Sequence, residues 1–210
     1  MDCRRRAALE LALLAVATPA LLVLAPHRPV LLDVALATLG LALVASGWRA
    51  TRRSAWAAPP PAIARRRADR ALAAATLTLL ALMVATALAL GRAMDPLRAA
   101  AALATAALFT PWAWLQQALF QFYLLGRLRV LLPNAADILV AAIDGAVFAA
   151  VHAPAWDLVI VTGPAGWLWS GYYLRARRLW PLALSHAALG TGYFYAVRGE
   201  DLLERWLAFL

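Results

Sequence analysis

Six polar side chains able to take part in chemistry lie in the apolar second half of this sequence. They are three amides, one carboxyl group and two imidazoles: Gln116, Gln117, Gln121, Asp144, His152 and His186. A charged side chain at the middle of a membrane span costs about 2.5–3.5 kcal/mol on insertion scales, so polar groups that persist there need an explanation. A neutral imidazole accepts a proton from water, and an amide orients that water by hydrogen bonding.

The three glutamines have helical spacing. Gln117 and Gln121 are four residues apart and share one helix face, whereas Gln116 lies about 100° away around the same helix. Such polar stripes normally face the interior of a helix bundle. The alternative is that the glutamines and histidines are interhelical hydrogen-bond partners, worth about 0.6 kcal/mol each.

Asp144 is the carboxyl group that lies deepest in this region. Together with Phe148 and His152 it forms a stripe with four-residue spacing. Without a partner in lipid this carboxyl group would be protonated. It lies two helical turns from His152, roughly 12 Å along the axis, which is far for a direct bond. We expect Asp144 to have a structural or supporting role, and a substitute acid or base is the alternative.

A metal site is a less well supported interpretation of the same residues. Two histidines without a carboxylate or cysteine at ligand spacing form an incomplete ligand set, unless Asp144 joins them. The single cysteine, Cys3, lies in the basic N-terminal segment. We expect no metal and no other cofactor.

The order of these motifs resembles a known family. The segment Trp112–Gln121 resembles the Glu-Glu-x-x-x-Arg motif of the CAAX-prenyl-protease-like and bacteriocin-processing intramembrane proteases, the CPBP or Abi group. Phe148–His152 resembles the family's Phe-x-x-x-His motif, and His186–Gly190 resembles its His-x-x-x-Asn motif. The resemblance covers roughly Leu97 to Gly192.

This resemblance implies an intramembrane endopeptidase that acts on membrane-associated or C-terminal peptide segments. In the family, a glutamate and the histidines activate water against a peptide carbonyl, while another polar residue holds the oxyanion. The implied catalytic residues are Gln116, Gln117, His152 and His186. The implied supporting residues around them are Gln121, Asp144, Phe148 and Gly190.

The sequence departs from the family pattern at three places. Gln116 and Gln117 replace the glutamate pair, and an amide cannot act as a general base. Gln121 replaces the arginine that would pair with the second glutamate, so both members of that ion pair are neutral. Gly190 replaces the asparagine of the third motif. The paired loss of charge indicates a natural subfamily.

Two functional readings stay open. In the first, neutral His152 or His186 accepts the proton of the water near the ordinary imidazole pKa of about 6.5, and Gln116 orients that water. In the second, the chain is an inactive pseudoprotease that binds membrane peptides or partner proteins. A small-solute transporter is a third class, but transporters usually contain paired repeats, and the two halves of this sequence do not resemble each other.

The composition predicts the elements that must position these residues. The chain is 64% hydrophobic and 15% charged, whereas a soluble domain is nearer half apolar and a quarter charged. Its apolar runs are continuous, which favours helices over β-barrel strands. The net charge of +9 comes from arginines beside these runs. This placement indicates membrane orientation, so the expected partners are the bilayer and a membrane-anchored peptide, without nucleic acid.

We predict an all-α polytopic membrane protein with about seven spans. They cover approximately residues 7–25, 30–47, 71–90, 97–125, 136–153, 158–174 and 179–197. Pro111 is expected to kink the fourth span without splitting it. The Arg/Pro-rich segment 48–70 is expected to be a solvated loop, and residues 198–210 a short amphipathic tail.

The arginines predict the orientation. With a cytoplasmic N-terminus, fifteen of the twenty arginines lie inside, as the positive-inside rule requires. The expected location is the inner (cytoplasmic) membrane, crossed several times. The expected organisation is three N-terminal spans in 1–92, a CPBP-like core of four spans in 93–197, and the tail.

Overall fold

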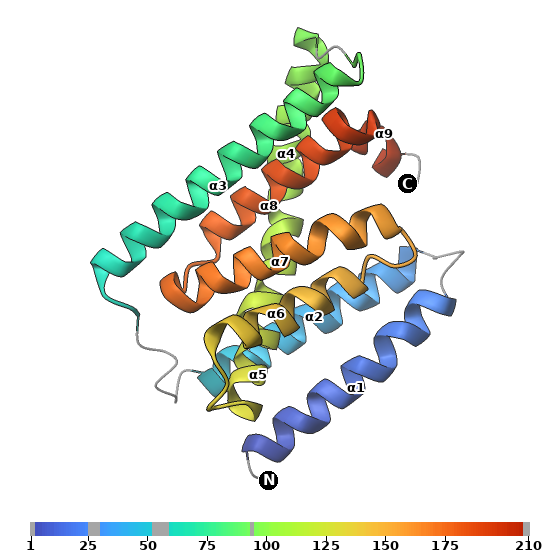
Figure 1. The fold of residues 1–210 in the computed structure, drawn as a ribbon. Helices are drawn as coiled ribbons and strands as arrows, with labels where there is room; N and C mark the ends of the chain where they lie inside the picture. Colours follow the sequence, from blue (N-terminus) through green and yellow to red (C-terminus); the bar gives the residue numbers. More distant parts are fainter. Residues whose placement is uncertain (1–2, 25–29, 52–58, 93–94, 208–210) are drawn as a thin grey trace. The chain divides into compact units, whose positions relative to one another are not determined.

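Every regular element in the described part of the chain is a helix. The computed structural model describes residues 3–24, 30–51, 59–92 and 95–207. The helices are α1 (Cys3–Leu24), α2 (Val30–Thr51), α3 (Ala62–Ala89), α4 (Pro96–Gln117), the π-helix η2 (Ala118–Leu124), α5 (Leu125–Leu131), α6 (Asp137–Ala150), α7 (Trp156–Ala176), α8 (Trp180–Gly192), the π-helix η3 (Tyr193–Arg198) and α9 (Leu202–Leu207) (Figure 1). The predicted all-α class is therefore confirmed.

One helix meets the requirements for a membrane span by length and composition. Among the described residues this is α3, which has 28 residues and a mean hydropathy of 2.2 in its most apolar window. Only 11% of that window is buried inside the protein. The side chains of residues 15–37, including Asp33, lie outside the described set, as does the predicted turn at residues 26–29.

The predicted fourth span is one uninterrupted helical segment. The helix continues through Pro111, then through η2 and α5, and ends at Leu131. A proline removes one backbone hydrogen bond without necessarily ending a helix. The segment extends six residues beyond the expected end at Leu125. Arg127, expected just beyond the end of this span, consequently lies in a helix and is buried.

The expectation of a loop up to residue 70 is wrong. Helix α3 begins at Ala62, so its first turns contain Arg65, Arg66, Arg67 and Arg70. The carbonyl of Pro61 accepts a hydrogen bond from the Arg65 N–H at 3.1 Å. Prolines are compatible with a helix start, and arginine is a good helix former, so the helix begins directly after the proline run. Residues 52–58 of the expected loop lie outside the described residues.

The chain forms two compact units, each built from two separate segments. Residues 1–65 and 117–177 form the first unit, and residues 66–116 and 178–210 form the second. In the first unit α6 packs extensively on α7, α1 contacts α5, and α2 contacts η2. The division into 1–92, 93–197 and 198–210 stays a prediction.

Two glycines bring α6 and α7 into close contact within the first unit. A Cβ atom on Gly145 would lie 2.6 Å from the backbone nitrogen of Trp167, and one on Gly166 would lie 3.0 Å from the Cα of Gly145. Small residues allow helix backbones to approach in this way. The crossing places Asp144, next to Gly145, against the turn of α7 that follows Gly166.

Candidate functional site

The glutamine motif lies where α4 changes into a π-helix. Gln117 ends α4, and Gln121 lies within η2. Both side chains are fully buried, which agrees with the interior face predicted for them. Gln116 is half-buried, and its Oε1 atom has no hydrogen-bond partner among the described residues. π-Helical turns are rare and occur frequently at functional sites.

A buried polar cluster connects η2, α6 and α7. The Ser170 Oγ atom lies 2.7 Å from Oδ2 of Asp144, 2.6 Å from the carbonyl oxygen of Gly166 and 3.3 Å from Oε1 of Gln121. Gln121, Asp144 and Ser170 all have 0% exposure. We call these three residues the Gln121 cluster. The structure therefore gives Asp144 a direct partner, and that partner is not His152.

Ser170 is a member of this cluster that sequence reasoning missed. It lies four residues after Gly166, on the same face of α7. That spacing is visible in the sequence, in the small-residue segment from Gly166 to Gly171. The signal could have shown that a hydroxyl group lies at the helix crossing, but not which residue it meets.

The backbone fixes the tautomer of His152. This residue follows the end of α6, and its Nδ1 lies 2.8 Å from the carbonyl oxygen of Phe148. Because a carbonyl oxygen only accepts, Nδ1 carries the proton and donates it. Oγ1 of Thr162 lies 3.4 Å from the same nitrogen, and its own proton is donated to the carbonyl of Leu158 at 2.7 Å. The lone pair of neutral His152 is therefore on Nε2.

Phe148 supports the His152 ring from within the core. It is fully buried, and its ring lies edge-on to those of Phe120 (4.9 Å, 85°) and Trp169 (5.6 Å, 88°). The His152 ring centroid lies 5.1 Å from that of Phe148. Edge-on aromatic pairs contribute about 0.5–1.5 kcal/mol beyond burial. The phenylalanine of the Phe-x-x-x-His motif thus joins η2, α6 and α7 beneath the histidine.

The second unit contains the other predicted histidine. His186 lies on α8 with 6% exposure, and its ring is edge-on to Phe109 of α4 at 5.6 Å. Gly190 lies one turn further along α8. A Cβ atom there would lie 3.3 Å from Cε1 of Phe109 and 3.9 Å from Cδ2 of His186. The position that holds asparagine in the family motif therefore adjoins the His186 ring.

The structure gathers part of the predicted site within each unit. The first unit holds Gln117, Gln121, Asp144, Phe148 and His152, and the second holds Gln116, His186 and Gly190. The predicted convergence of the four catalytic residues involves both units and stays a prediction. Among the described residues, no three His, Cys, Asp or Glu side chains are grouped as metal ligands.

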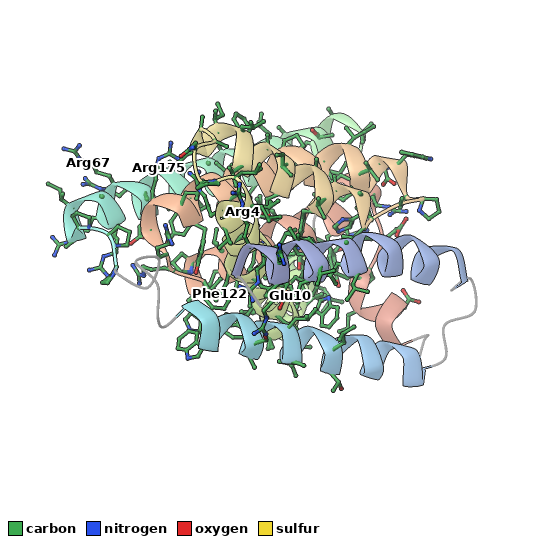
Figure 2. The ribbon with its side chains drawn as sticks, turned by 90° about the horizontal axis from the view of Figure 1, so that it is seen from below. Arg4, Glu10, Arg67, Phe122 and Arg175 are labelled. Atoms are coloured by element: carbon green, nitrogen blue, oxygen red, sulfur yellow. The ribbon has the colours of Figure 1, made fainter. Side chains whose placement is uncertain are left out.

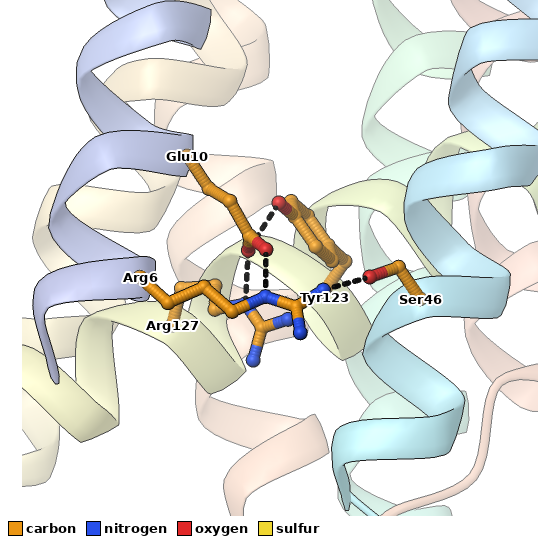
Figure 3. A network of polar contacts seen from close by, with 5 residues as sticks. All are labelled: Arg6, Glu10, Ser46, Tyr123 and Arg127. Carbon is orange, nitrogen blue, oxygen red and sulfur yellow. Dashed lines mark hydrogen bonds and ion pairs between the residues drawn. The ribbon is translucent and has the colours of Figure 1, made fainter. Parts of the chain in front are cut away.

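A second polar network joins the N-terminal helices to the segment that carries the glutamines. The Glu10 carboxylate accepts hydrogen bonds from the Tyr123 hydroxyl (2.8 Å), the Arg127 Nε (2.7 Å) and the Arg6 Nε (2.8 Å) (Figure 3). Arg6 also donates to Oγ of Ser46 on α2 at 2.9 Å. Figure 2 shows Glu10 on the side of α1 that faces α2. We call these five residues the Glu10 network.

The comparison with protein families supports the family resemblance. Residues 96–191 match the family model described as type II CAAX prenyl endopeptidase Rce1-like. This segment belongs to the CAAX-protease-like family. The match extends from the start of α4 almost to the end of α8 and includes all eight predicted site residues. Searches of curated proteins and of solved structures found no match.

Proposed function

We propose that this chain is a multi-pass intramembrane endopeptidase that cuts membrane-associated or C-terminal peptide segments. The family to which residues 96–191 belong is one of membrane-embedded proteases. On α3, Leu77, Leu82 and Leu88 are 67%, 58% and 66% exposed. Leu77 and Leu88 lie on nearly the same face of the helix, and Leu82 lies about 140° away around it. Exposed apolar side chains therefore occupy more than one face of α3, which suits a helix in contact with lipid.

The observation that carries this proposal is the fixed tautomer of His152. Its Nδ1–H donates to the Phe148 carbonyl oxygen, so Nε2 is available as a proton acceptor. In the proposed reaction Nε2 accepts a proton from water, and the resulting hydroxide attacks the peptide carbonyl carbon. The imidazolium then gives this proton to the leaving amine, which completes hydrolysis without a carboxylate base.

The glutamines have a different role from the glutamates of the family. A side-chain amide keeps its charge state at every physiological pH, so Gln116 and Gln117 orient the water or donate N–H groups to the oxyanion. His186 is proposed to be the second imidazole of the site.

The experiment is a cleavage assay on membrane-anchored peptides in liposomes. His152→Ala and His186→Ala are each expected to abolish cleavage, because a general base contributes about 10²–10⁴-fold. Asp144→Asn is expected to have a smaller effect. Gln116→Glu is expected to retain or raise the rate, because it restores a carboxylate beside the water. His27→Ala provides the matched control, since it removes the third histidine of the chain.

A pseudoprotease is the second candidate function. The observation in its favour is that both motif glutamates are amides, at Gln116 and Gln117. This reading predicts that the wild-type chain binds a membrane peptide without cutting it and that Gln116→Glu does not start cleavage. That pair of results would replace the enzymatic proposal.

A further inference from the structure

The Gln121 cluster contains two short oxygen–oxygen contacts around one hydroxyl group. Ser170 Oγ lies 2.6 Å from the Gly166 carbonyl oxygen and 2.7 Å from Oδ2 of Asp144. Both distances are typical of O–H···O hydrogen bonds, and each such bond needs one proton between the oxygens. The serine hydroxyl supplies a single proton, and a carbonyl oxygen supplies none. One proton shared between both acceptors bends both bonds away from linearity and weakens them, so two short contacts are better satisfied when Asp144 supplies the second proton.

Turning the amide of Gln121 does not remove this requirement. The oxygen and nitrogen of a glutamine side chain are assigned from their surroundings, so Gln121 can present either N–H or C=O to Ser170 at 3.3 Å. An N–H in that place would donate to a lone pair of Oγ. It would not place a proton between Ser170 and Asp144. The two short oxygen–oxygen contacts therefore still need two protons.

The surroundings of Asp144 also suit an uncharged carboxyl group. Its side chain is fully buried, and its second oxygen, Oδ1, has no hydrogen-bond partner among the described residues. An ionised carboxylate offers about four acceptor sites and requires donors for them. Ser170 from α7, which bonds Asp144, and Gln121 from η2, which lies 3.3 Å from the same Ser170 hydroxyl, do not titrate. No ion pair of the described residues includes Asp144.

We propose that Asp144 is a neutral carboxylic acid at neutral pH and donates its proton to Ser170, while Ser170 donates to the Gly166 carbonyl. The Gln121 cluster is then a charge-free connection between the π-helix, α6 and α7. Gln121 lies one turn from Gln117 and Phe148 lies one turn from Asp144, so Asp144 is a positioning residue for both motif segments. This inference does not depend on whether the chain cuts peptides.

The charge-free cluster gives a physical reason for the glutamine at position 121. An arginine there would place a cation beside the buried carboxyl group and would favour its ionised form. Glutamine offers hydrogen-bond donors without charge. Gln121 and protonated Asp144 are therefore mutually compatible, and an arginine at position 121 is expected to ionise Asp144.

Infrared spectroscopy of the full chain in nanodiscs at pH 7 tests this proposal. The difference spectrum between the wild type and Asp144→Asn is expected to contain the C=O stretch of one protonated carboxyl group. Asp95→Asn is the matched control: Asp95 is exposed and caps the N–H of Arg98 at 2.8 Å, so its difference spectrum is expected to show only ionised carboxylate bands.

Two further variants separate this proposal from a merely structural role. In Ser170→Ala the carboxyl band is expected to persist at a shifted frequency, because the acid loses its acceptor. In Gln121→Arg it is expected to disappear, because the guanidinium ionises Asp144. Ionised carboxylate bands at pH 7 in the wild type minus Asp144→Asn spectrum would overturn the proposal. If Asp144→Asn fails to fold, an absence of any protonated carboxyl band from the wild type would overturn it as well.

Discussion

The Nε atom of Arg127 lies 2.7 Å from Oε2 of Glu10, a residue 117 positions earlier in the chain. The Arg127 side chain is 7% exposed and that of Glu10 is 18% exposed. Tyr123 donates to the same carboxylate oxygen, and the Arg127 guanidinium lies 5.1 Å from the Tyr123 ring centroid. A helix outside the family match is thus fixed to the segment just after the glutamine motif by a largely buried ion pair.

Arg127→Gln is expected to lower the thermal stability of the protein strongly. Removing one member of a buried ion pair leaves the other charge without compensation, which costs about 3–5 kcal/mol. Arg6→Gln is the matched control, because Arg6 contacts the same carboxylate with a side chain that is 50% exposed. Exposed pairs contribute about 0–1 kcal/mol. Melting temperatures of the two variants in the same detergent measure these effects. Equal decreases in melting temperature would contradict the expected difference between the buried and the exposed ion pair.

Gly145→Ala is expected to destabilise the α6–α7 pair. The new Cβ atom would lie 2.6 Å from the backbone nitrogen of Trp167, and a backbone atom cannot rotate away. Overpacking of this kind costs about 1–3 kcal/mol. Gly163→Ala is the control on the same interface, since its Cβ atom would lie at an ordinary 3.5 Å from the Ala149 Cβ. The melting temperature of Gly145→Ala should be lower than that of Gly163→Ala. Similar values would show that α6 and α7 can move apart slightly with little loss of stability.

The fold class and the positions of the helices could be predicted from the sequence, because continuous apolar runs bounded by arginine and proline determine them. The ends of the helices could not. The Pro61 carbonyl accepts the Arg65 N–H where α3 begins, and Arg127, which donates to Glu10 of α1, lies in α5, which continues to Leu131. Both ends depend on partners that hydropathy does not describe.

The candidate site could be predicted in part. Spacing placed Gln117 and Gln121 on an interior face, and both are buried. Spacing along one helix could not reveal that Asp144 meets Ser170, because this contact depends on a crossing of two helices at Gly145 and Gly166. Contacts between helices are set by shape, and the hydrophobic pattern of each helix alone does not contain that information.

The predicted orientation leads to a labelling experiment with a membrane-impermeant thiol reagent. In a Cys3→Ser background, cysteines at Pro60 and Arg175 are expected to react only from the cytoplasmic side, and one at Arg28 only from outside. Arg175 is exposed, and its guanidinium donates to the carbonyl of Gly171 in its own helix, at 2.8 Å. Labelling at Arg175 from outside would mean that residues 97–125 cross the membrane twice.

Gly190→Asn is expected to fold and to raise the rate of peptide cleavage. The new Cβ atom would lie 3.9 Å from Cδ2 of His186, so the added amide would adjoin the imidazole, as the family motif implies. Asparagine is also a better helix former than glycine, by a few tenths of a kcal/mol. The cost is a contact of 3.3 Å with Cε1 of Phe109, which requires that ring to move slightly.

Gly190→Ala separates the two contributions in this experiment, because it adds the Cβ atom without the amide. Cleavage rates and melting temperatures should be measured for both variants. A higher rate in Gly190→Asn alone assigns the gain to hydrogen bonding at His186, because both variants share the contact with Phe109. A loss of activity in both, with unchanged melting temperatures, would mean that the space beside His186 must stay empty for the peptide. Glycine would then be a requirement of this subfamily, and the motif's asparagine would have no counterpart here.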